Sequence, residues 1–142
     1  MSPDFEFKGR KYKLRKLDPF KQLHIVRRIT PILTELSSLM KGGGVKKFSD
    51  IEKLSEAEKL DVIAKFLTPV LSGMSKLSDE DTEYVMFGLL ECVEVQQAQG
   101  NWVTLVNGRM LMMQDLELPE LINAAGRAFG FNLSRFFSVL PQ

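Results

Sequence analysis

The sequence predicts a mainly α fold, a compact helical domain of four to five helices with an N-terminal β-hairpin and a second short β-hairpin near residues 102–113. Three observations predict it. Apolar residues recur at three- and four-residue spacing over several segments that open on capping residues. Two places instead show short apolar runs on either side of a glycine-containing turn. The 142 residues, 44% of them hydrophobic, suit one core, so we expect residues 1–142 to form a single domain.

The first hairpin is expected around Lys8-Gly9-Arg10. Apolar residues sit at two-residue spacing on both sides of this turn, which lets their side chains share one face. These residues are Phe5, Phe7, Tyr12 and Leu14. The other face is basic and contains Lys11, Lys13 and Arg15, as is typical of an exposed strand that avoids uncontrolled edge pairing.

The first helix begins at Asp18-Pro19, an N-cap followed by a first-turn proline, and Pro31 is expected to bend or interrupt it. Its predicted buried stripe comprises Phe20, Leu23, Ile25, Val26, Ile29, Leu33 and Leu36. Three consecutive glycines then end the helix. We expect a flexible connection over about residues 41–50.

The next helix opens at Ser55, where Ser55 and Glu58 fit a capping box. Its predicted buried side comprises Leu60, Ile63, Phe66, Leu67, Val70, Leu71 and Met74. A third helix follows Ser78, with acids crowding its first turn as the helix dipole prefers. It is expected to run to about Gln99, with Gly100 as its C-terminal cap.

The second hairpin is expected at Asn107-Gly108, which separates "WVTLV" from "RMLMM" and is the dipeptide most typical of a two-residue turn. A last helix begins within residues 115–119. Its predicted inward residues are Leu118, Leu121, Ile122, Ala125 and Phe129. We expect a break at Gly130, followed by a mobile aromatic tail over residues 130–142.

Composition predicts a cytoplasmic protein without membrane association. No apolar run approaches about 18 residues, the length of a membrane span, and charges stand where a secretory signal would be apolar. Cys92 is the only cysteine, so it has no partner for an intramolecular disulfide, and its apolar neighbours predict burial.

Charge is distributed unevenly along the chain. Residues 1–48 contain 12 Lys/Arg and 4 Asp/Glu, whereas residues 49–142 contain 7 and 14, so the two parts carry net charges of +8 and −7. Such asymmetry can serve nucleic-acid binding, docking to an acidic protein or head-to-tail self-association. The simplest interpretation is a solvated basic face balanced by acidic helices.

The residues offer no catalytic constellation. His24 is the only histidine, and metal sites need three or four converging ligands. The glycine run lacks the Gly-Lys-Ser/Thr ending of a phosphate-binding loop. The acids after Ser78 occupy successive helix positions and not the alternating positions of a calcium loop. We therefore expect no catalytic residues, no metal site, no cofactor and no enzymatic activity.

The basic face of the first hairpin leaves one alternative open. Aromatic residues interleave with Lys11, Lys13 and Arg15, as in proteins that bind single-stranded nucleic acid, so a nucleic-acid-binding regulator is a competing hypothesis. A net charge of only +1 weighs against it. The alternation also assigns those aromatics to the core, which favours a solvated edge strand.

Four segments occur in an informative order. They are "FEFKGRKYKLRKLDPFKQLHIVRRITPIL", "LSDEDTEYVMFGLLECVEVQQ", "WVTLVNGRMLMMQDLELPELI" and the terminal "NLSRFF". In this order the chain resembles the tail assembly chaperones of tailed bacteriophages and prophages, over most of its length except the glycine-rich middle. The resemblance implies a non-enzymatic helical protein that keeps the long tape-measure protein soluble, recruits tail-tube subunits and leaves the finished tail.

A chaperone of this kind needs adaptable apolar surface, and methionines and exposed aromatics supply it. The residues predicted to bind a partner are Trp102, Met110, Met112, Met113, Phe136, Phe137, Val139 and Leu140. Core filling is the competing interpretation of the methionines. An unpaired hairpin edge would also permit homo-oligomers. A structural adaptor retained in the virion is the alternative function within a phage.

Overall fold

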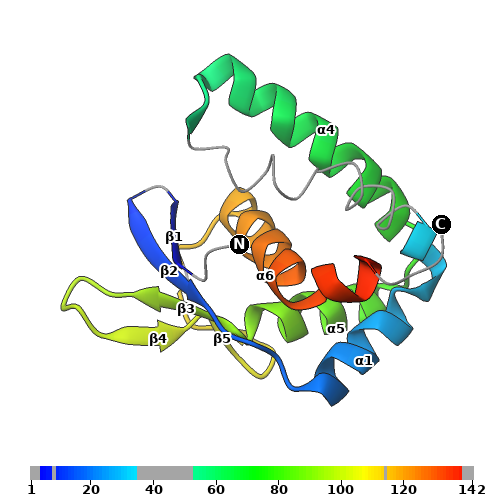
Figure 1. Cartoon of the computed structure of the whole chain (residues 1–142). Coiled ribbons are helices and arrows are strands. Elements are labelled where there is room, and N and C mark those ends of the chain that lie inside the picture. Colours follow the sequence, from blue (N-terminus) through cyan, green and yellow to red (C-terminus); the bar gives the residue numbers. More distant parts are fainter. Residues whose placement is uncertain (1–3, 8, 35–52, 114, 139–142) are drawn as a thin grey trace.

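The chain folds into a four-stranded antiparallel sheet with helices packed on one of its faces (Figure 1). This computed structural model describes residues 4–7, 9–34, 53–113 and 115–138. The expectation of a mainly α fold is wrong, because the strands form a continuous layer and not two isolated hairpins. The protein is a mixed α/β molecule with one sheet layer and one helix layer.

The main sheet has the strand order β1-β2-β3-β4. β1 (Asp4–Phe7) and β2 (Arg10–Leu14) form the predicted N-terminal hairpin, which is confirmed. β3 (Val93–Gln96) pairs with β2, and β4 (Trp102–Thr104) pairs with β3. Each pairing is antiparallel. β3 therefore joins the N-terminal hairpin to the C-terminal half of the chain.

The helix predicted to reach Gln99 ends much earlier. α5 (Asp79–Leu90) stops before β3, although its predicted cap is confirmed, since the Ser78 side chain accepts from the backbone N–H of Asp81. In β3, two fully buried valines alternate with half-buried polar residues. That two-residue period is a strand pattern. Gly100 has a φ of +95° in the turn between β3 and β4, so it caps no helix.

Leu105 connects the main sheet to a second, two-stranded sheet. Its N–H donates to the carbonyl of Val93 at 2.9 Å, and its carbonyl accepts from the N–H of Met112 at 2.9 Å. β5 (Val106–Asn107) and β6 (Met110–Leu111) continue this second ladder. Leu105 is thus bonded to both sheets.

The hairpin predicted at Asn107-Gly108 is confirmed for β5 and β6, with a φ of +62° at Gly108 in the turn. Its predicted first strand divides in two. Trp102 and its two successors pair with β3, and only the residues after Leu105 pair with β6.

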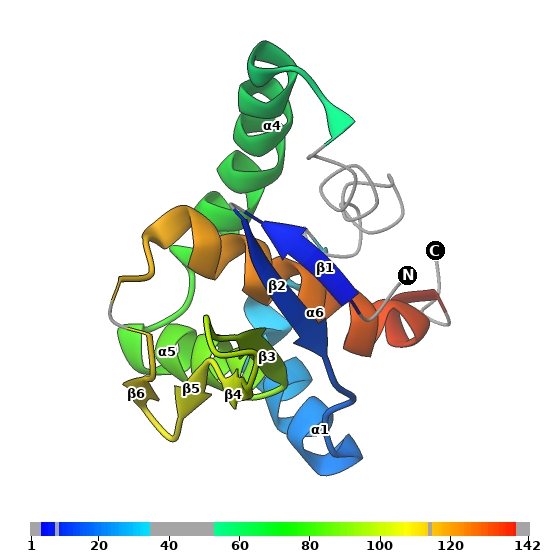
Figure 2. The same cartoon turned by 90° about the vertical axis from the view of Figure 1, so that its left-hand side faces the viewer.

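α6 (Leu118–Ser138) covers the inner face of the sheet, and Figure 2 shows it behind β1 and β2. α5 packs against α6, and α1 (Pro19–Arg28) packs against α5. The largest completely buried side chains come from both layers: Tyr12, Ile25, Ile29, Val93, Val95, Leu105, Val106 and Leu133. Ala124 and Ala128 are also buried in α6, and such small side chains let a helix approach a sheet closely.

α1 confirms its predicted start and its predicted end. The Asp18 carboxylate accepts from the Phe20 N–H at 2.7 Å, and Pro31 lies in the short 3-10 helix η1 (Thr30–Ile32) that follows α1. The predicted buried stripe is partly wrong, because Phe20 and Leu23 are 73% and 57% exposed.

α4 (Glu56–Met74) opens with the predicted capping box, which is confirmed. Its predicted buried side is wrong at Leu60 and Leu71, which are exposed, whereas Met74 packs against the core. The side chains of the other predicted members lie outside the described residues; they are Ile63, Phe66, Leu67 and Val70. α4 meets the core near its C-terminal end, where a Cβ on Gly73 would lie 3.4 Å from the Ile32 side chain. In both views α4 projects from the rest of the described chain (Figures 1 and 2). The predicted connection at residues 41–50 lies outside the described residues.

α6 runs unbroken through Gly130, so the predicted break there is wrong. Gly130 is itself buried, and the helix packs its small and apolar residues against the sheet on both sides of it. That packing outweighs the helix-propensity cost of one glycine, about 1 kcal/mol. Residues 139–142 of the predicted tail lie outside the described residues. No described helix combines the length and hydropathy that a membrane span requires.

Asn132 fastens the two layers together. Its side-chain oxygen accepts from the Leu17 N–H at 2.7 Å, and its amide nitrogen donates to the Arg15 carbonyl at 3.2 Å and to the Cys92 sulfur at 3.4 Å. One buried side chain in α6 therefore holds the β2–α1 connection and the start of β3. No buried side-chain nitrogen or oxygen among the described residues lacks a hydrogen-bond partner.

Candidate partner-binding surfaces

Large apolar side chains are exposed in four places among the described residues. One is Leu118, the first residue of α6, which was predicted to point inward but is 67% exposed. The methionine edge consists of Met110 and Met112, which are 67% and 47% exposed. The outer face of α1 carries Phe20 and Leu23, and α4 carries Leu60 and Leu71. Only the methionine edge is among the predicted binding residues. Burial of apolar area is the main favourable term in protein association, so each is a candidate contact surface.

The methionine edge is held in place by α5. Arg109, in the turn before β6, makes an ion pair with Glu83 of α5 at 2.9 Å, and its guanidinium lies 5.9 Å from the centre of the Phe87 ring. Arg109 and Glu83 are both largely exposed, so this pair contributes at most about 1 kcal/mol. The hairpin is held mainly by burial of Val106 in β5 and by Leu111 of β6, which packs against the core. It therefore presents two flexible thioether side chains on a fixed backbone.

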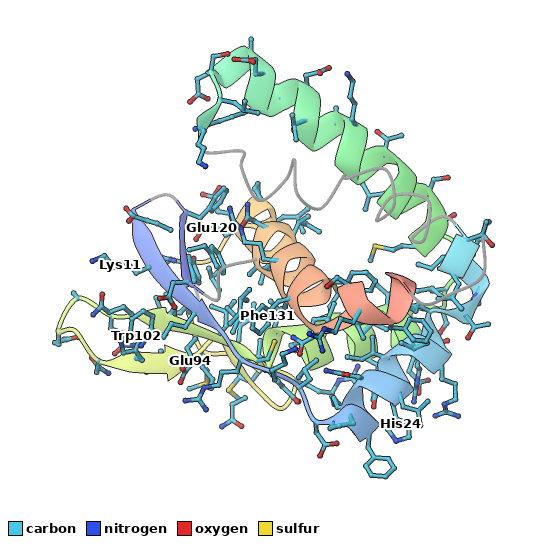
Figure 3. All side chains as sticks on the ribbon, viewed as in Figure 1. Lys11, His24, Glu94, Trp102, Glu120 and Phe131 are labelled. Carbon is cyan, nitrogen blue, oxygen red and sulfur yellow. The ribbon has the colours of Figure 1, made fainter. Side chains whose placement is uncertain are left out.

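Trp102 lies on the uncovered face of the sheet, at its β4 edge. Figure 3 shows Trp102, Lys11 and Glu94 on the side of the sheet away from α6. The Lys13 ammonium lies 4.3 Å from the centre of the indole ring, a cation–π contact that covers part of it. Trp102 is consequently half-buried, and β4 is the last strand of its sheet.

The other predicted binding residues lie elsewhere. Met113 is half-buried, packs against the core and lines a shallow groove of about 620 Å³ between the turn after β1 and the β3–β4 turn. Phe136 also packs against the core from α6. The side chains of Phe137, Val139 and Leu140 lie outside the described residues. The structure thus brings Met110 and Met112 together and does not group Met113 or Phe136 with them.

The predicted basic face is interleaved with acids. Lys13 stands between Asp4 of β1 and Glu94 of β3 in the sheet register. Lys11 stands opposite Glu6, and the Arg15 guanidinium makes an ion pair with Glu94 at 3.1 Å. Neighbouring side chains of opposite charge cancel the positive electrostatic potential that binding of a nucleic-acid phosphate backbone requires. This arrangement does not favour the nucleic-acid hypothesis.

The outer face of α1 could not be predicted from the sequence, because two overlapping apolar stripes compete in that helix. Ile25, Ile29 and Ile32 are buried at spacings of four and three, and they face away from Phe20 and Leu23. Lys21 and Arg28, the polar neighbours of the buried stripe, could have identified the inner face of α1. Lys21 makes an ion pair with Glu91 and Arg28 makes one with Asp81, and both acids lie at the ends of α5.

Buried polar groups among the described residues stabilise contacts between elements of the core. The Tyr12 hydroxyl donates to Glu120 at 3.2 Å, and Glu120 also pairs with Arg10 at 3.3 Å. Burial, together with the adjacent Glu120 carboxylate, raises the pKa of Tyr12 to about 12. Burial also raises the pKa of the Cys92 thiol to about 11, which keeps it protonated and unreactive at neutral pH.

His24 points outward from α1 (Figure 3). Within the described ranges, no group of three His, Cys, Asp or Glu side chains is arranged to hold a metal ion.

The chain was compared with known proteins. No curated protein and no solved structure matches it. The protein-family profile described as "Phage tail assembly chaperone protein, TAC" matches residues 8–141.

Proposed function

The chain belongs to the phage tail assembly chaperone family, and from this premise we propose that it is a non-enzymatic chaperone that binds the tape-measure protein. We further propose that it helps to recruit tail-tube subunits while that client is held soluble. The family match, which covers nearly the whole chain, carries this proposal. The exposed methionine edge supports it.

A tape-measure protein is a long helix former whose apolar stripes aggregate when they are left uncovered. A chaperone for it needs an apolar surface that tolerates many local sequences, because successive turns of the client differ. Unbranched thioether side chains provide this adaptability. Met110 lies in β6 and Met112 directly follows that strand, both are exposed, and Arg109 and Glu83 beside them supply a charged rim.

The experiment is co-expression of this protein with the tape-measure protein and the tail-tube protein of its phage. We expect the tape-measure protein to be soluble and to co-purify with this chain. The double substitution Met110→Glu/Met112→Glu should lower the captured client at least tenfold, because it places two charges in an apolar contact. The matched control is Leu118→Glu, which changes another exposed apolar residue, 67% exposed, outside that edge.

Unchanged solubility of the tape-measure protein, with no co-purification, would contradict the chaperone proposal. Equal loss of capture in the Met110→Glu/Met112→Glu and Leu118→Glu variants would keep the function and reject the methionine edge as its site. Recovery of this chain in purified, finished tails would identify a structural adaptor of the virion instead.

A further inference from the structure

The two edges of the main sheet differ in their protection. β1 forms one edge and β4 forms the other. β1 carries two acids, Asp4 and Glu6, whereas β4 consists of Trp102, Val103 and Thr104 and has no charged residue and no proline. Charges and prolines on an edge strand discourage a further strand from pairing with it. β4 lacks this protection, and its aromatic and β-branched residues favour extended pairing.

The hydrogen bonds at both ends of β4 define which of its backbone groups face β3. The Leu105 N–H donates to the Val93 carbonyl at 2.9 Å, and the Gln97 N–H donates to the Asn101 carbonyl at 2.8 Å. In an antiparallel ladder, opposing residues alternate between pairs that exchange hydrogen bonds and pairs that do not. Val103 lies two residues from both Asn101 and Leu105, so its N–H and carbonyl face β3.

Trp102 and Thr104 therefore direct their N–H and carbonyl groups away from β3, along the open edge. On that outer side, neither residue makes a backbone hydrogen bond to any described residue. Each thus offers one donor and one acceptor. The Val103 side chain lies between them on the inner face, where it packs against the core.

The Trp102 indole stands beside this edge on the outer face of the sheet (Figure 3). The Lys13 ammonium lies 4.3 Å from the centre of the ring and restricts its movement. The indole is half-buried, so part of it remains free for contact. An aromatic side chain in this position packs well against a β-branched side chain on a neighbouring strand.

We propose that the β4 edge binds an extended segment of the tail-tube subunit as an additional strand. The identity of this partner rests on the proposed function. Only an extended chain has backbone groups free to pair with the edge, because a helix bonds its own groups internally. The helical tape-measure protein is therefore unsuited to this site, and the tail-tube subunit is the other partner of the proposed function.

The register of β4 defines the segment that fits. Residues opposite Trp102 and Thr104 share the outer face with them, so polar or β-branched side chains suit these two positions. The residue between them faces inward beside Val103 and should be apolar. The methionine edge follows Leu105 and β4 precedes it, so the two partners contact different residues.

Residue-resolved amide hydrogen exchange of the full chain, with and without purified tail-tube protein, tests this pairing directly. In the free chain, the N–H groups of Trp102 and Thr104 should exchange fast, whereas that of Val103 is protected by β3. In the complex, exchange at Trp102 and Thr104 should slow at least tenfold, and exchange at Val103 should change less. Contacts with side chains alone would not produce this alternation.

A proline variant tests the same edge by pull-down. Thr104→Pro removes an outward donor and blocks an added strand, so it should lower capture of tail-tube protein at least tenfold and leave capture of the tape-measure protein unchanged. Thr104→Val is the first control, because it changes the side chain but keeps the N–H, and it should bind like wild type.

The second control is Glu6→Pro, the same substitution on the opposite edge of the sheet. The Arg15 N–H donates to the Cys92 carbonyl, so by the same alternation the backbone groups of Glu6 point away from β2. Glu6→Pro should therefore capture tail-tube protein like wild type. Circular dichroism verifies that each variant is folded, and the exchange pattern of the wild type decides the matter if Thr104→Pro does not fold.

The outcomes separate this inference from the proposed function. A wild-type chain that captures no tail-tube protein would contradict recruitment, and this inference would fail with it. Capture that folded Thr104→Pro retains, or unchanged exchange at Trp102 and Thr104 in the complex, would reject the β4 edge alone. Protection of these two amides by the tape-measure protein, or by a second copy in the concentrated free chain, would overturn the assignment to the tail-tube subunit.

Discussion

At the scale of single residues, the contact between Tyr12 and Glu120 is the most informative. Tyr12 stacks on Phe5 of β1 with ring centres 4.9 Å apart, and the guanidinium of Arg127, in α6, lies 4.4 Å from the centre of the Phe5 ring. Glu120, 7% exposed, accepts from Tyr12 and pairs with Arg10, which also contacts Asp115. These contacts attach the N-terminal hairpin to the beginning and middle of α6.

We predict that the stability of the protein falls in a defined alkaline range because of Tyr12. An unfolded tyrosine ionises near pH 10.0, whereas the pKa of Tyr12 in the folded protein is raised to about 12 by burial and then by Glu120. Between these values the unfolded chain loses a proton that the folded chain keeps. The free energy of unfolding should therefore decrease by up to about 2–3 kcal/mol as pH rises through that window.

Urea unfolding of the wild type and Tyr12→Phe from pH 8 upward checks this prediction. The variant lacks the hydroxyl bond to Glu120, so it should be less stable at pH 8 by about 1 kcal/mol, but it should lose less stability at higher pH. Identical slopes for the two proteins would contradict it.

At the scale of elements, the contact between α1 and α5 depends on a glycine. A Cβ on Gly88 would lie 3.1 Å from the Lys21 side chain and 3.3 Å from that of Ile25. We predict that Gly88→Val destabilises the protein by about 2 kcal/mol, because a branched side chain overpacks this crossing. Gly88→Ala should cost less, since the gain in helix propensity offsets part of the crowding.

Thermal or urea unfolding measures both Gly88 variants. Ala57→Val, at an exposed position of α4, is the matched control, because it reports the helix cost of valine without a packing partner. A Gly88→Val variant no less stable than Ala57→Val would show that α1 and α5 do not approach closely at this point.

Local sequence signals predicted the element starts well. The caps at Asp18, Ser55 and Ser78 and the turn at Asn107-Gly108 depend on neighbouring residues only, and all are confirmed. β3 was missed because its pairing partners lie about 80 residues away in β2, and the four-residue alternation is too short to outweigh the preceding helical pattern. The break predicted at Gly130 failed because packing along α6 overrides propensity.

The candidate surfaces were predicted less well than the elements. Partner binding and core filling were both open for the methionines; Met110 and Met112, at the end of the second hairpin, are exposed, whereas Met113 packs against the core. The exposure of Phe20 and Leu60 could not be predicted, because an apolar stripe reads the same whether it meets the core or a partner. α1 has a second apolar stripe that includes Ile25, and because α5 covers that stripe, the side with Phe20 is exposed.

At the scale of the whole molecule, we predict that α4 is the least protected helix of the described chain. Among the side chains of α4 that the structure describes, contact with the core is made near Gly73 and Met74, at its C-terminal end, while α5 and α6 bury residues along their length. Amide hydrogen exchange at low protein concentration should be at least about tenfold faster in the N-terminal half of α4 than in the middle of α6. Equal protection of these two segments would contradict this description of α4.

The two backbone hydrogen bonds of Leu105, one to each sheet, have a mechanical consequence. Its backbone is the joint between the strands that carry the methionine edge and the ladder that begins at Val93. A force applied to β6 would load this joint first and pass to β3, the strand that pairs with both β2 and β4. Such a force would reach the start of β3, beside Cys92, whose sulfur accepts a hydrogen bond from Asn132, the residue that joins the sheet and helix layers.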